Sequence, residues 1–386
     1  MRYKLNKAEN FIEFKNGKSI KPGGEGVYPV YGANGIIGMS DEWKEQNSII
    51  IGRVGAYCGT VQFCRKQYWA SDNTIVAYPK DNDTDVSFLY YLLKYANLNR
   101  WAGGAAQPLM TQTVIKQIEL PYPDIVFQRK IASVLSAYDD LIENNTRRIQ
   151  ILEEMAQRLY REWFADFRFP GHKKAKFIDS EMGKIPEGWE VKQLNNYVDF
   201  ERGVEPGSDN YEKQPNKENV PFLRVGDLGD RSIEIFINRS LTKNKIIKED
   251  DIAVSMDGSP GIVKMGLFGC YSSGIRKPII KNNAMKKSFL YFLMISEHIQ
   301  NIIKAHSKGT TILHASESIE HMNFILPAND LMITFDEIVS PMIREILLFN
   351  KKNKVLRETR DLLLPKLISG ELDVSNLDIV IQEQEA

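Results

Sequence analysis

The chain has 386 residues, of which 43% are hydrophobic and 26% charged, and its formal net charge is zero. This is enough material for two domains of ordinary size plus long helices, whereas the neutral charge argues against a free-standing nucleic-acid-binding protein. The first residues lack the apolar core of a signal peptide, and no apolar run approaches the length of a membrane span. Three cysteines without metal-site spacing read as reduced thiols. We therefore expect a cytoplasmic protein with no membrane segment.

Residues 1–123 are predicted to form an α+β domain, the first of two. Short β-rich runs such as YPVYGANGIIG and NTIVAYP are separated by Gly, Asn and Pro. A helix is predicted at Val86–Asn97. A glycine-rich loop then follows at Trp101–Thr111, and a last strand is expected over IKQIELPYP.

Residues 124–170 contain one long helix, predicted from Pro123 to Phe164, and a connector. Apolar or core-compatible residues recur at alternating steps of four and three, which is the seam of a coiled coil. About forty residues at 1.5 Å each make a rod of roughly 60 Å. The predicted seam residues of this helix include Ile131, Leu135, Ile142, Asn145, Ile149, Leu152 and Leu159.

Residues 171–327 repeat the pattern of the first domain. FKNGKSI (14–20) corresponds to FERGVEP (200–206), and SFLYYLL (87–93) corresponds to SFLYFLM (288–294). The offset between matching segments grows along the chain, so the second domain carries insertions. The sequence therefore predicts two similar α+β domains.

Residues 328–375 are predicted to form a second long helix, followed by a tail at 376–386. From Ile142 onward the seam of the first helix returns 204 positions later. The second seam includes Ile346, Phe349, Asn353, Leu356, Leu363 and Leu367. One Asn in each seam is a device that fixes register. We expect an antiparallel coiled coil with a domain at each end and a pseudo-twofold repeat; the alternative is that each helix covers the core of its own domain.

Motifs for chemistry are missing from the sequence. At Gly17-Lys18-Ser19 the position that needs the first glycine of a phosphate-binding loop is Ile12. Dinucleotide-binding and base-flipping methyltransferase motifs are absent, and the five histidines lack zinc-site spacing. The sequence therefore predicts no catalytic residue, no metal site and no cofactor bound by this chain.

The order domain, helix, domain, helix resembles the specificity subunit of type I restriction-modification systems. The residues that carry the resemblance include RLYREWFADFRFPG (158–171), GKIPEGW (183–189), LPYPDIVFQRKIA, the loops WAGGAAQP and SKGTTILHAS, and LRETRDLLLPKLISGELDV (356–374). The first domain lacks the IPEGW lead that opens the second, and the C-terminal SGELDV is a candidate to close against it.

The resemblance implies a non-enzymatic subunit that binds double-stranded DNA with a bipartite target. Each recognition domain would read one half, while the helices would set the spacing and dock two methylation subunits. Restriction and translocation subunits would complete the complex. S-adenosylmethionine, ATP and magnesium are expected on those partner subunits. The alternative from another class is a structural or adaptor protein whose duplicated domains bind protein partners.

Candidate DNA contacts are polar residues predicted in loops, since Arg and Lys suit guanine or phosphate and Asn and Gln suit adenine. For each of them a solvated surface role is the competing interpretation. Those of the first domain are Lys18, Lys21, Arg53, Tyr57, Asn73, Arg100 and Gln107. Those of the second domain are Arg202, Lys213, Arg224, Lys243, Lys245, Arg276, Lys277, Lys308, Thr310 and Thr311.

Two further features have open interpretations. The glycine loops around Gly103-Gly104 and Gly309 fall at equivalent places, and they are either tight turns or points of close approach to a partner. The aromatic group Tyr160, Trp163, Phe164, Phe167 and Phe169 is expected to pack under the second domain, with a partner-binding hot spot as the alternative.

Overall fold

The computed structural model describes residues 3–104, 107–229, 233–309 and 313–377, and it divides into two compact units. Unit 1 is formed by Met1–Asn144 together with Asn353–Ala386, and unit 2 by Asn145–Lys352. Each unit combines one of the predicted domains with part of each long helix, α4 (Ile125–Tyr160) and α7 (Asn329–Ser369). Among the helices in the described ranges, none is long and apolar enough to cross a membrane.

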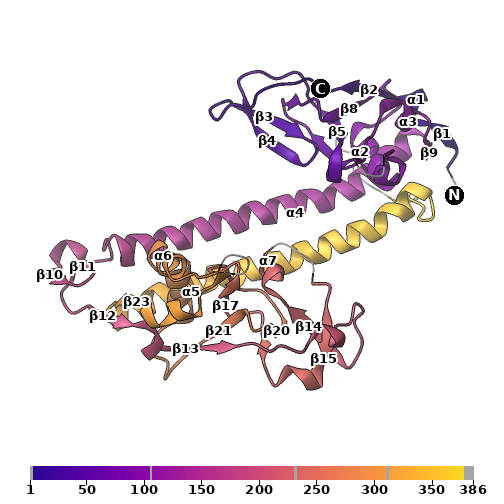
Figure 1. Cartoon of the computed structure of the whole chain (residues 1–386). Coiled ribbons are helices and arrows are strands. Elements are labelled where there is room, and N and C mark those ends of the chain that lie inside the picture. Colours follow the sequence, from indigo (N-terminus) through magenta and orange to yellow (C-terminus); the bar gives the residue numbers. More distant parts are fainter. Residues whose placement is uncertain (1–2, 105–106, 230–232, 310–312, 378–386) are drawn as a thin grey trace. The chain divides into compact units, whose positions relative to one another are not determined.

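Unit 1 is built on two sheets (Figure 1). The first is antiparallel, in the order β2 (Ile12–Asn16), β8 (Thr74–Pro79), β5 (Ser48–Gly52) and β6 (Val61–Cys64). The second has the order β4 (Gly35–Ser40), β3 (Tyr28–Gly32) and β7 (Trp69–Ala70), with β3 parallel to β7. A separate antiparallel pair joins β1 (Leu5–Lys7) to β9 (Glu119–Pro121).

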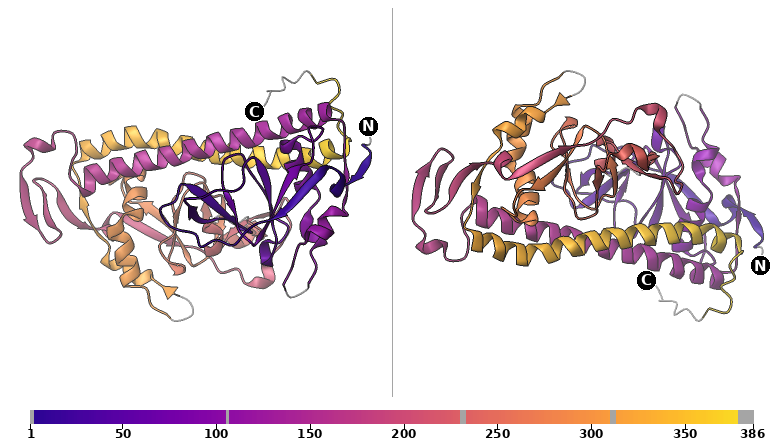
Figure 2. Two further views of the ribbon diagram at one scale, coloured as in Figure 1. Left: turned by 90° about the horizontal axis from the view of Figure 1, so that it is seen from above. Right: turned by 90° about the horizontal axis from the view of Figure 1, so that it is seen from below.

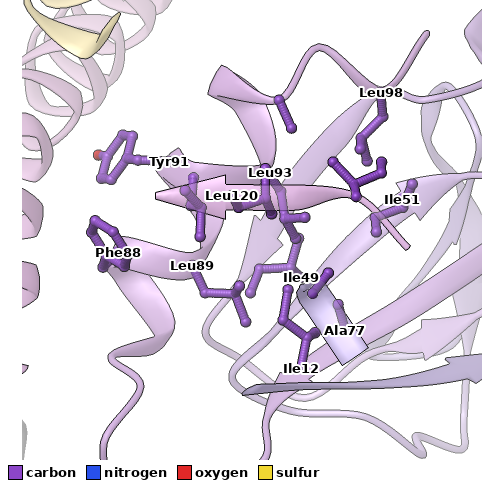
Figure 3. Close-up of a cluster of buried hydrophobic side chains, with 14 of the residues drawn as sticks. Ile12, Ile49, Ile51, Ala77, Phe88, Leu89, Tyr91, Leu93, Leu98 and Leu120 are labelled. Carbon is purple, nitrogen blue, oxygen red and sulfur yellow. The ribbon is translucent and has the colours of Figure 1, made fainter. Parts of the chain in front are cut away.

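The helices of unit 1 are α1 (Ala8–Phe11), α2 (Val86–Tyr95) and α3 (Gln112–Lys116). Helix α2 begins after Asp85, whose carboxylate accepts a hydrogen bond from the backbone N–H of Phe88 at 2.8 Å. Its apolar face packs on the first sheet, where Leu89 and Leu93 lie beside Ile49 in the core (Figure 3).

The last strand predicted for the first domain is partly wrong. Ile115 and Lys116 belong to α3, and the strand itself is limited to Glu119–Pro121. The reason is a helix cap: the Thr111 hydroxyl accepts a hydrogen bond from the N–H of Val114 at 3.3 Å and starts a short helix.

Unit 2 repeats this architecture with insertions. One antiparallel sheet has the order β13 (Val198–Arg202), β21 (Ile275–Ile280), β17 (Ala253–Ser255) and β19 (Val263–Lys264). A second has the order β15 (Phe236–Asn238), β14 (Asn219–Leu223), β20 (Gly269–Tyr271) and β16 (Ile246–Ile247), with β14 parallel to β20. Three antiparallel pairs complete it: β10 (Phe177–Ser180) with β11 (Gly183–Pro186), β12 (Glu190–Gln193) with β23 (Asn323–Leu326), and β18 (Asp257–Gly258) with β22 (Leu313–His314).

Helices α5 (Lys287–Ile295) and α6 (Glu297–Ala305) cover the core of unit 2, together with the aromatic end of α4. Helix α4 ends at Tyr160 and continues as a π-helical turn, Arg161–Ala165, so the predicted end at Phe164 falls inside that turn. The Phe164 ring lies 5.0 Å from the rings of Phe289 and Phe335. The prediction that the aromatic group packs under the second domain is therefore confirmed.

The two long helices run antiparallel within each unit, as Figure 2 also shows from two sides. In unit 1, Ile131 and Leu135 of α4 share a buried cluster with Leu367 of α7. In unit 2, Ala156 of α4 shares a cluster with Val339 of α7. Within unit 1, Ile142 lies later in α4 than Leu135 and contacts Asn353, which lies earlier in α7 than Leu367, and this is the antiparallel pairing predicted from the seam.

Every seam residue named from the sequence as helix-pair core is at least half-buried. The buried ones are Ile131, Leu135, Asn145, Ile149, Phe349, Asn353 and Leu367. The half-buried ones are Ile142, Leu152, Leu159, Ile346, Leu356 and Leu363. Asn353 is 2% exposed, and its amide donates to the backbone carbonyl of Ile142 across the pair at 3.5 Å. A polar group buried in the seam in this way favours one register over others.

The C-terminal segment packs onto the first domain. Val374 is 1% exposed and lies in the same buried cluster as Ala8 and Phe11. The Lys130 ammonium on α4 donates to the carbonyls of Ser375 and Leu377, each at 2.9 Å. The expectation that SGELDV closes against the first domain agrees with these contacts.

Candidate nucleic-acid interface

A charged cleft of about 600 Å³ opens in unit 2. It forms where the ends of β13, β21, β18 and β22 meet, because strand pairing places Arg202 opposite Arg276 and Asp257 opposite His314. We call it the charged cleft after its ionisable lining residues, which are Arg202, Glu205, Asp257, Arg276, Lys308, His314 and Glu317.

Lys308 and His314, which follow α6 in the chain, line one side of the charged cleft. Their backbones exchange two hydrogen bonds, of 2.9 and 2.8 Å. The His314 ring Nδ1 lies 2.8 Å from the Asp257 carboxylate, which ties this side to β18. The second contact holds the His314 ring at the charged cleft.

Arg276 lies at the base of the charged cleft and is 6% exposed. Its guanidinium donates to the carbonyl of Ser273 and, at 2.7 Å, to the hydroxyl of Ser316. Burial lowers the pKa of this guanidinium below its usual value, and the neighbouring charge of Arg202 lowers it further, against the effect of Asp257. Arg202 and Arg276 thus face the same space, and the negative charge of Asp257 offsets their positive charges only in part.

Most other charges of the charged cleft are already paired. Glu205 accepts a hydrogen bond from the Ser273 hydroxyl, and Glu317 accepts one from Lys308 at 2.5 Å, which lowers the pKa of Glu317. Arg202 differs: it is exposed, and its side chain forms no hydrogen bond or ion pair with any residue in the described part of the chain. Arg202 is therefore the cation best placed to bind a ligand there.

The equivalent surface of unit 1 is found through the strand register. In unit 1, Asn16 at the end of β2 pairs with Ile75 of β8. In unit 2, Arg202 at the end of β13 pairs with Arg276 of β21 in the same way. An isolated backbone bridge of unit 1 joins Val54 to Leu109. It corresponds to the pairing of Asp257 with His314 between β18 and β22 of unit 2.

A second backbone pairing also matches between the two units. The backbones of Gly103 and Leu109 pair just as those of Lys308 and His314 do. Gln112, three residues after Leu109, occupies the place of Glu317. We call Asn16, Val54, Leu109 and Gln112 the neutral surface.

Amide and apolar groups make up the neutral surface of unit 1. The side-chain amides of Gln112 and Asn16 are hydrogen-bonded at 2.9 Å. Ile75 is fully buried, whereas Leu109 is 39% exposed. Positions that carry charge in unit 2 are thus uncharged in unit 1.

Comparison with known proteins identifies the family. The model of the type I restriction modification DNA specificity domain matches residues 4–154 and again residues 186–356. The chain belongs to this family. The resemblance read from the sequence is thereby confirmed, and each of the two matches covers one recognition domain with much of the helix that follows it.

Named relatives are specificity subunits. Over 315 residues the chain is 32% identical to the type I restriction enzyme MjaIX specificity subunit of Methanocaldococcus jannaschii, which covers 78% of this chain and 72% of the relative. It is 25% identical over 379 residues to the HindI specificity subunit of Haemophilus influenzae, covering 79% and 81%. The crystal structure of the type I restriction-modification S subunit from M. genitalium has the same fold, with a TM-score of 0.67 at 17% identity over 95% of this chain and 96% of that one.

Within the second specificity domain, the charged cleft brings together Arg202, Arg276 and Lys308 among the residues predicted to contact DNA. Lys245 and Lys277 instead form internal ion pairs, with Glu201 at 2.5 Å and Asp251 at 2.6 Å. The remaining predicted residues lie outside the cleft lining: Lys213 and Lys243 are exposed, Arg224 is exposed and pairs with Asp227 at 3.2 Å, and Thr310 and Thr311 lie outside the described residues.

Within the first specificity domain, the predicted contacts are mostly exposed. Exposed side chains are those of Lys18, Lys21, Tyr57, Asn73, Arg100 and Gln107. Arg53 is half-buried, and its guanidinium donates to the carbonyl of Asp72 at 3.4 Å. None of these residues belongs to the neutral surface, so the sequence-based choice and the structural equivalence select different groups in this domain.

Seven polar residues of the charged cleft were missed from the sequence. They are Glu205, Asp257, Ser272, Ser273, His314, Ser316 and Glu317. Acidic residues were not considered as DNA contacts, although a carboxylate accepts a hydrogen bond from the cytosine amino group. Nothing in the sequence singles them out, because they come from separate segments that strand pairing brings together.

Proposed function

We propose that this chain is the DNA-recognition subunit of a type I restriction-modification complex. Each specificity domain reads one half of a bipartite, asymmetric DNA sequence, and the paired helices set the number of unspecified base pairs between the halves. The observation that carries the proposal is the twofold family match to domains with the same strand order but different residues at equivalent positions. Two domains that share a fold but present different side chains suit a target with two unlike halves.

The chain performs no chemistry in this proposal. Two methylation subunits dock on the helices and carry S-adenosylmethionine, and restriction subunits with ATP and magnesium join them to cleave DNA in the cytoplasm. The zero net charge supports a division of labour, since tight binding requires the neutralisation of several phosphates. The partner subunits would supply much of that positive charge.

Mapping of DNA methylation tests the proposal. The chain is expressed with the methylation subunits of its own system in a host without adenine methylation, and N6-methyladenine is located across the genome. We expect one bipartite motif with a fixed gap, and no methylation when the chain is omitted. An unchanged methylation pattern without the chain would contradict the proposal and favour the adaptor function.

DNA binding by the purified proteins gives an independent measurement. The complex with methylation subunits should bind a duplex carrying the motif with an affinity that falls steeply as salt rises, because counterions are released from the phosphates. The isolated chain should bind the same duplex far more weakly. Equal binding with and without those subunits would contradict the proposed sharing of charge.

A further inference from the structure

We propose that the charged cleft reads a half-site containing a G·C base pair, with Arg202 contacting the guanine, and that the neutral surface of unit 1 reads a half-site of A·T pairs. This inference rests on the proposed function and adds the base composition of each half-site. It comes from the different side chains that the two units place at equivalent strand and loop positions.

The charged cleft has the properties of a binding site prepared in advance. Arg276 is buried at its base and held by Ser273 and Ser316, so its position is set before any ligand arrives. Placing Arg202 opposite Arg276 costs energy in the free protein, because like charges repel. A ligand that offers hydrogen-bond acceptors to Arg202 compensates for this repulsion.

The acidic residues of the charged cleft favour a base edge over a phosphate. Glu205, Asp257 and Glu317 line the same space as Arg202, and a phosphate entering it would be repelled by their carboxylates. A G·C pair fits both kinds of charge: guanine O6 and N7 accept hydrogen bonds from arginine, and the cytosine amino group donates to a carboxylate. The mixture of charges therefore indicates a G·C pair.

The neutral surface suits an A·T pair by the same reasoning. Asn and Gln amides recognise adenine N6 and N7, and apolar side chains contact the thymine methyl group. The mutual hydrogen bond of Asn16 and Gln112 orders both amides, and the partly exposed Leu109 stands where His314 stands in unit 2. An arginine in place of Asn16 would bring to unit 1 the cation that distinguishes the charged cleft.

The test is methylation mapping of variants in the complex with its methylation subunits. Arg202→Gln should lower methylation at the original motif about tenfold or more and relax one G·C position in one half-site, as expected for the loss of a bidentate contact. Arg202→Lys should keep the preference for that guanine. Asn16→Arg should alter only the other half-site. Lys184→Gln, an exposed cation on β11 outside the charged cleft, is the matched control and should change neither half-site.

Each alternative outcome overturns the inference. A uniform fall in methylation with Arg202→Gln, without relaxation of any base position, would mean a phosphate contact. A motif that stays unchanged would mean that the cleft does not touch DNA, and changes in both half-sites would mean a structural role. If the wild-type complex yields no bipartite motif at all, the proposed function fails and this inference fails with it. Assembly of each variant with the methylation subunits verifies folding.

Discussion

Arg360 of α7 donates a hydrogen bond to Asp139 of α4 in the seam between the helices. The same carboxylate accepts a hydrogen bond from the Tyr91 hydroxyl of α2 at 2.6 Å. The Arg360 side chain is 14% exposed and that of Asp139 is 28% exposed, so the pair is largely shielded from water. One carboxylate thus joins both long helices to the core of the first specificity domain.

Replacing Arg360 with methionine should destabilise unit 1. The substitution keeps the apolar stem but leaves Asp139 partly buried without its cation, and the remaining bond from Tyr91 offsets only part of the loss. We expect the free energy of unfolding to fall by about 2 kcal/mol, measured by chemical denaturation of the purified chain.

A double-mutant cycle distinguishes the ion pair from simple packing. Removing both charges with Arg360→Met and Asp139→Leu should cost less than the sum of the single losses. Arg357→Met, on an exposed position of the same helix, is the control and should change stability little. Additive losses would contradict the coupling of Arg360 to Asp139.

The periodic pattern predicted the seam on both sides of Arg360, at Leu356 and Leu363, but not the partner of Arg360. A seam is visible in one sequence because its spacing is local, and the family resemblance predicted the two domains and the helix order. The charged cleft depends on contacts between distant segments, since Arg202, Asp257 and His314 lie on three different strands. Insertions shift the numbering between the two domains, so side chains at equivalent positions become visible only when the strand register is known.

Gly17 and Gly203 should tolerate no side chain. Both lie just after the first strand of their sheet, and an added Cβ would clash with the backbone carbonyls of Ser71 or Tyr271 respectively. Neither glycine is among those with positive φ, so the constraint is close approach of two backbone segments. We expect each alanine variant to lose roughly 2–4 kcal/mol, because backbone atoms must move to make room.

Denaturation of the alanine variants checks the clash. Gly23→Ala is the matched control, because nothing lies within 4 Å of the atom it would add. That substitution should leave stability unchanged or slightly raised. If Gly203→Ala and Gly23→Ala behave alike, close backbone approach is not the reason for the glycine shared by the two domains.

Glu201→Gln should destabilise unit 2 in a pH-dependent way. Burial raises the pKa of Glu201, but hydrogen bonds from Lys245 and Tyr271 outweigh it and lower the pKa below 4.5. Because the pKa is lower in the folded state than in the unfolded state, ionised Glu201 stabilises the fold above pH 4.5. This stabilisation is lost as the pH falls through the lowered pKa. We expect a loss of about 1 kcal/mol near neutral pH, discounted for the partial exposure of the ion pair.

The free energies of unfolding of the wild-type and Glu201→Gln proteins should converge in acid, because a protonated Glu201 is uncharged, as glutamine is. Chemical denaturation over a pH series measures the difference. Glu218→Gln, at an exposed position, is the control and should show a small difference that does not vary in this way. A difference between the Glu201 proteins that grows as pH falls would contradict the lowered pKa.

Inserting one heptad into both long helices should lengthen the unspecified gap in the DNA target. Seven residues complete two turns and preserve the seam, and they add about 10 Å to each helix. At about 3.4 Å per base pair this corresponds to roughly three further base pairs. Methylation mapping with the partner subunits should show the longer gap with both half-sites unchanged, because the inserted residues lie far along the chain from the charged cleft and the neutral surface.

An insertion into α4 alone is the control: it offsets Ile142 from Asn353 and should reduce methylation instead of lengthening the gap. If the bases of either half-site changed while the gap stayed the same, the helices would not be the element that sets spacing.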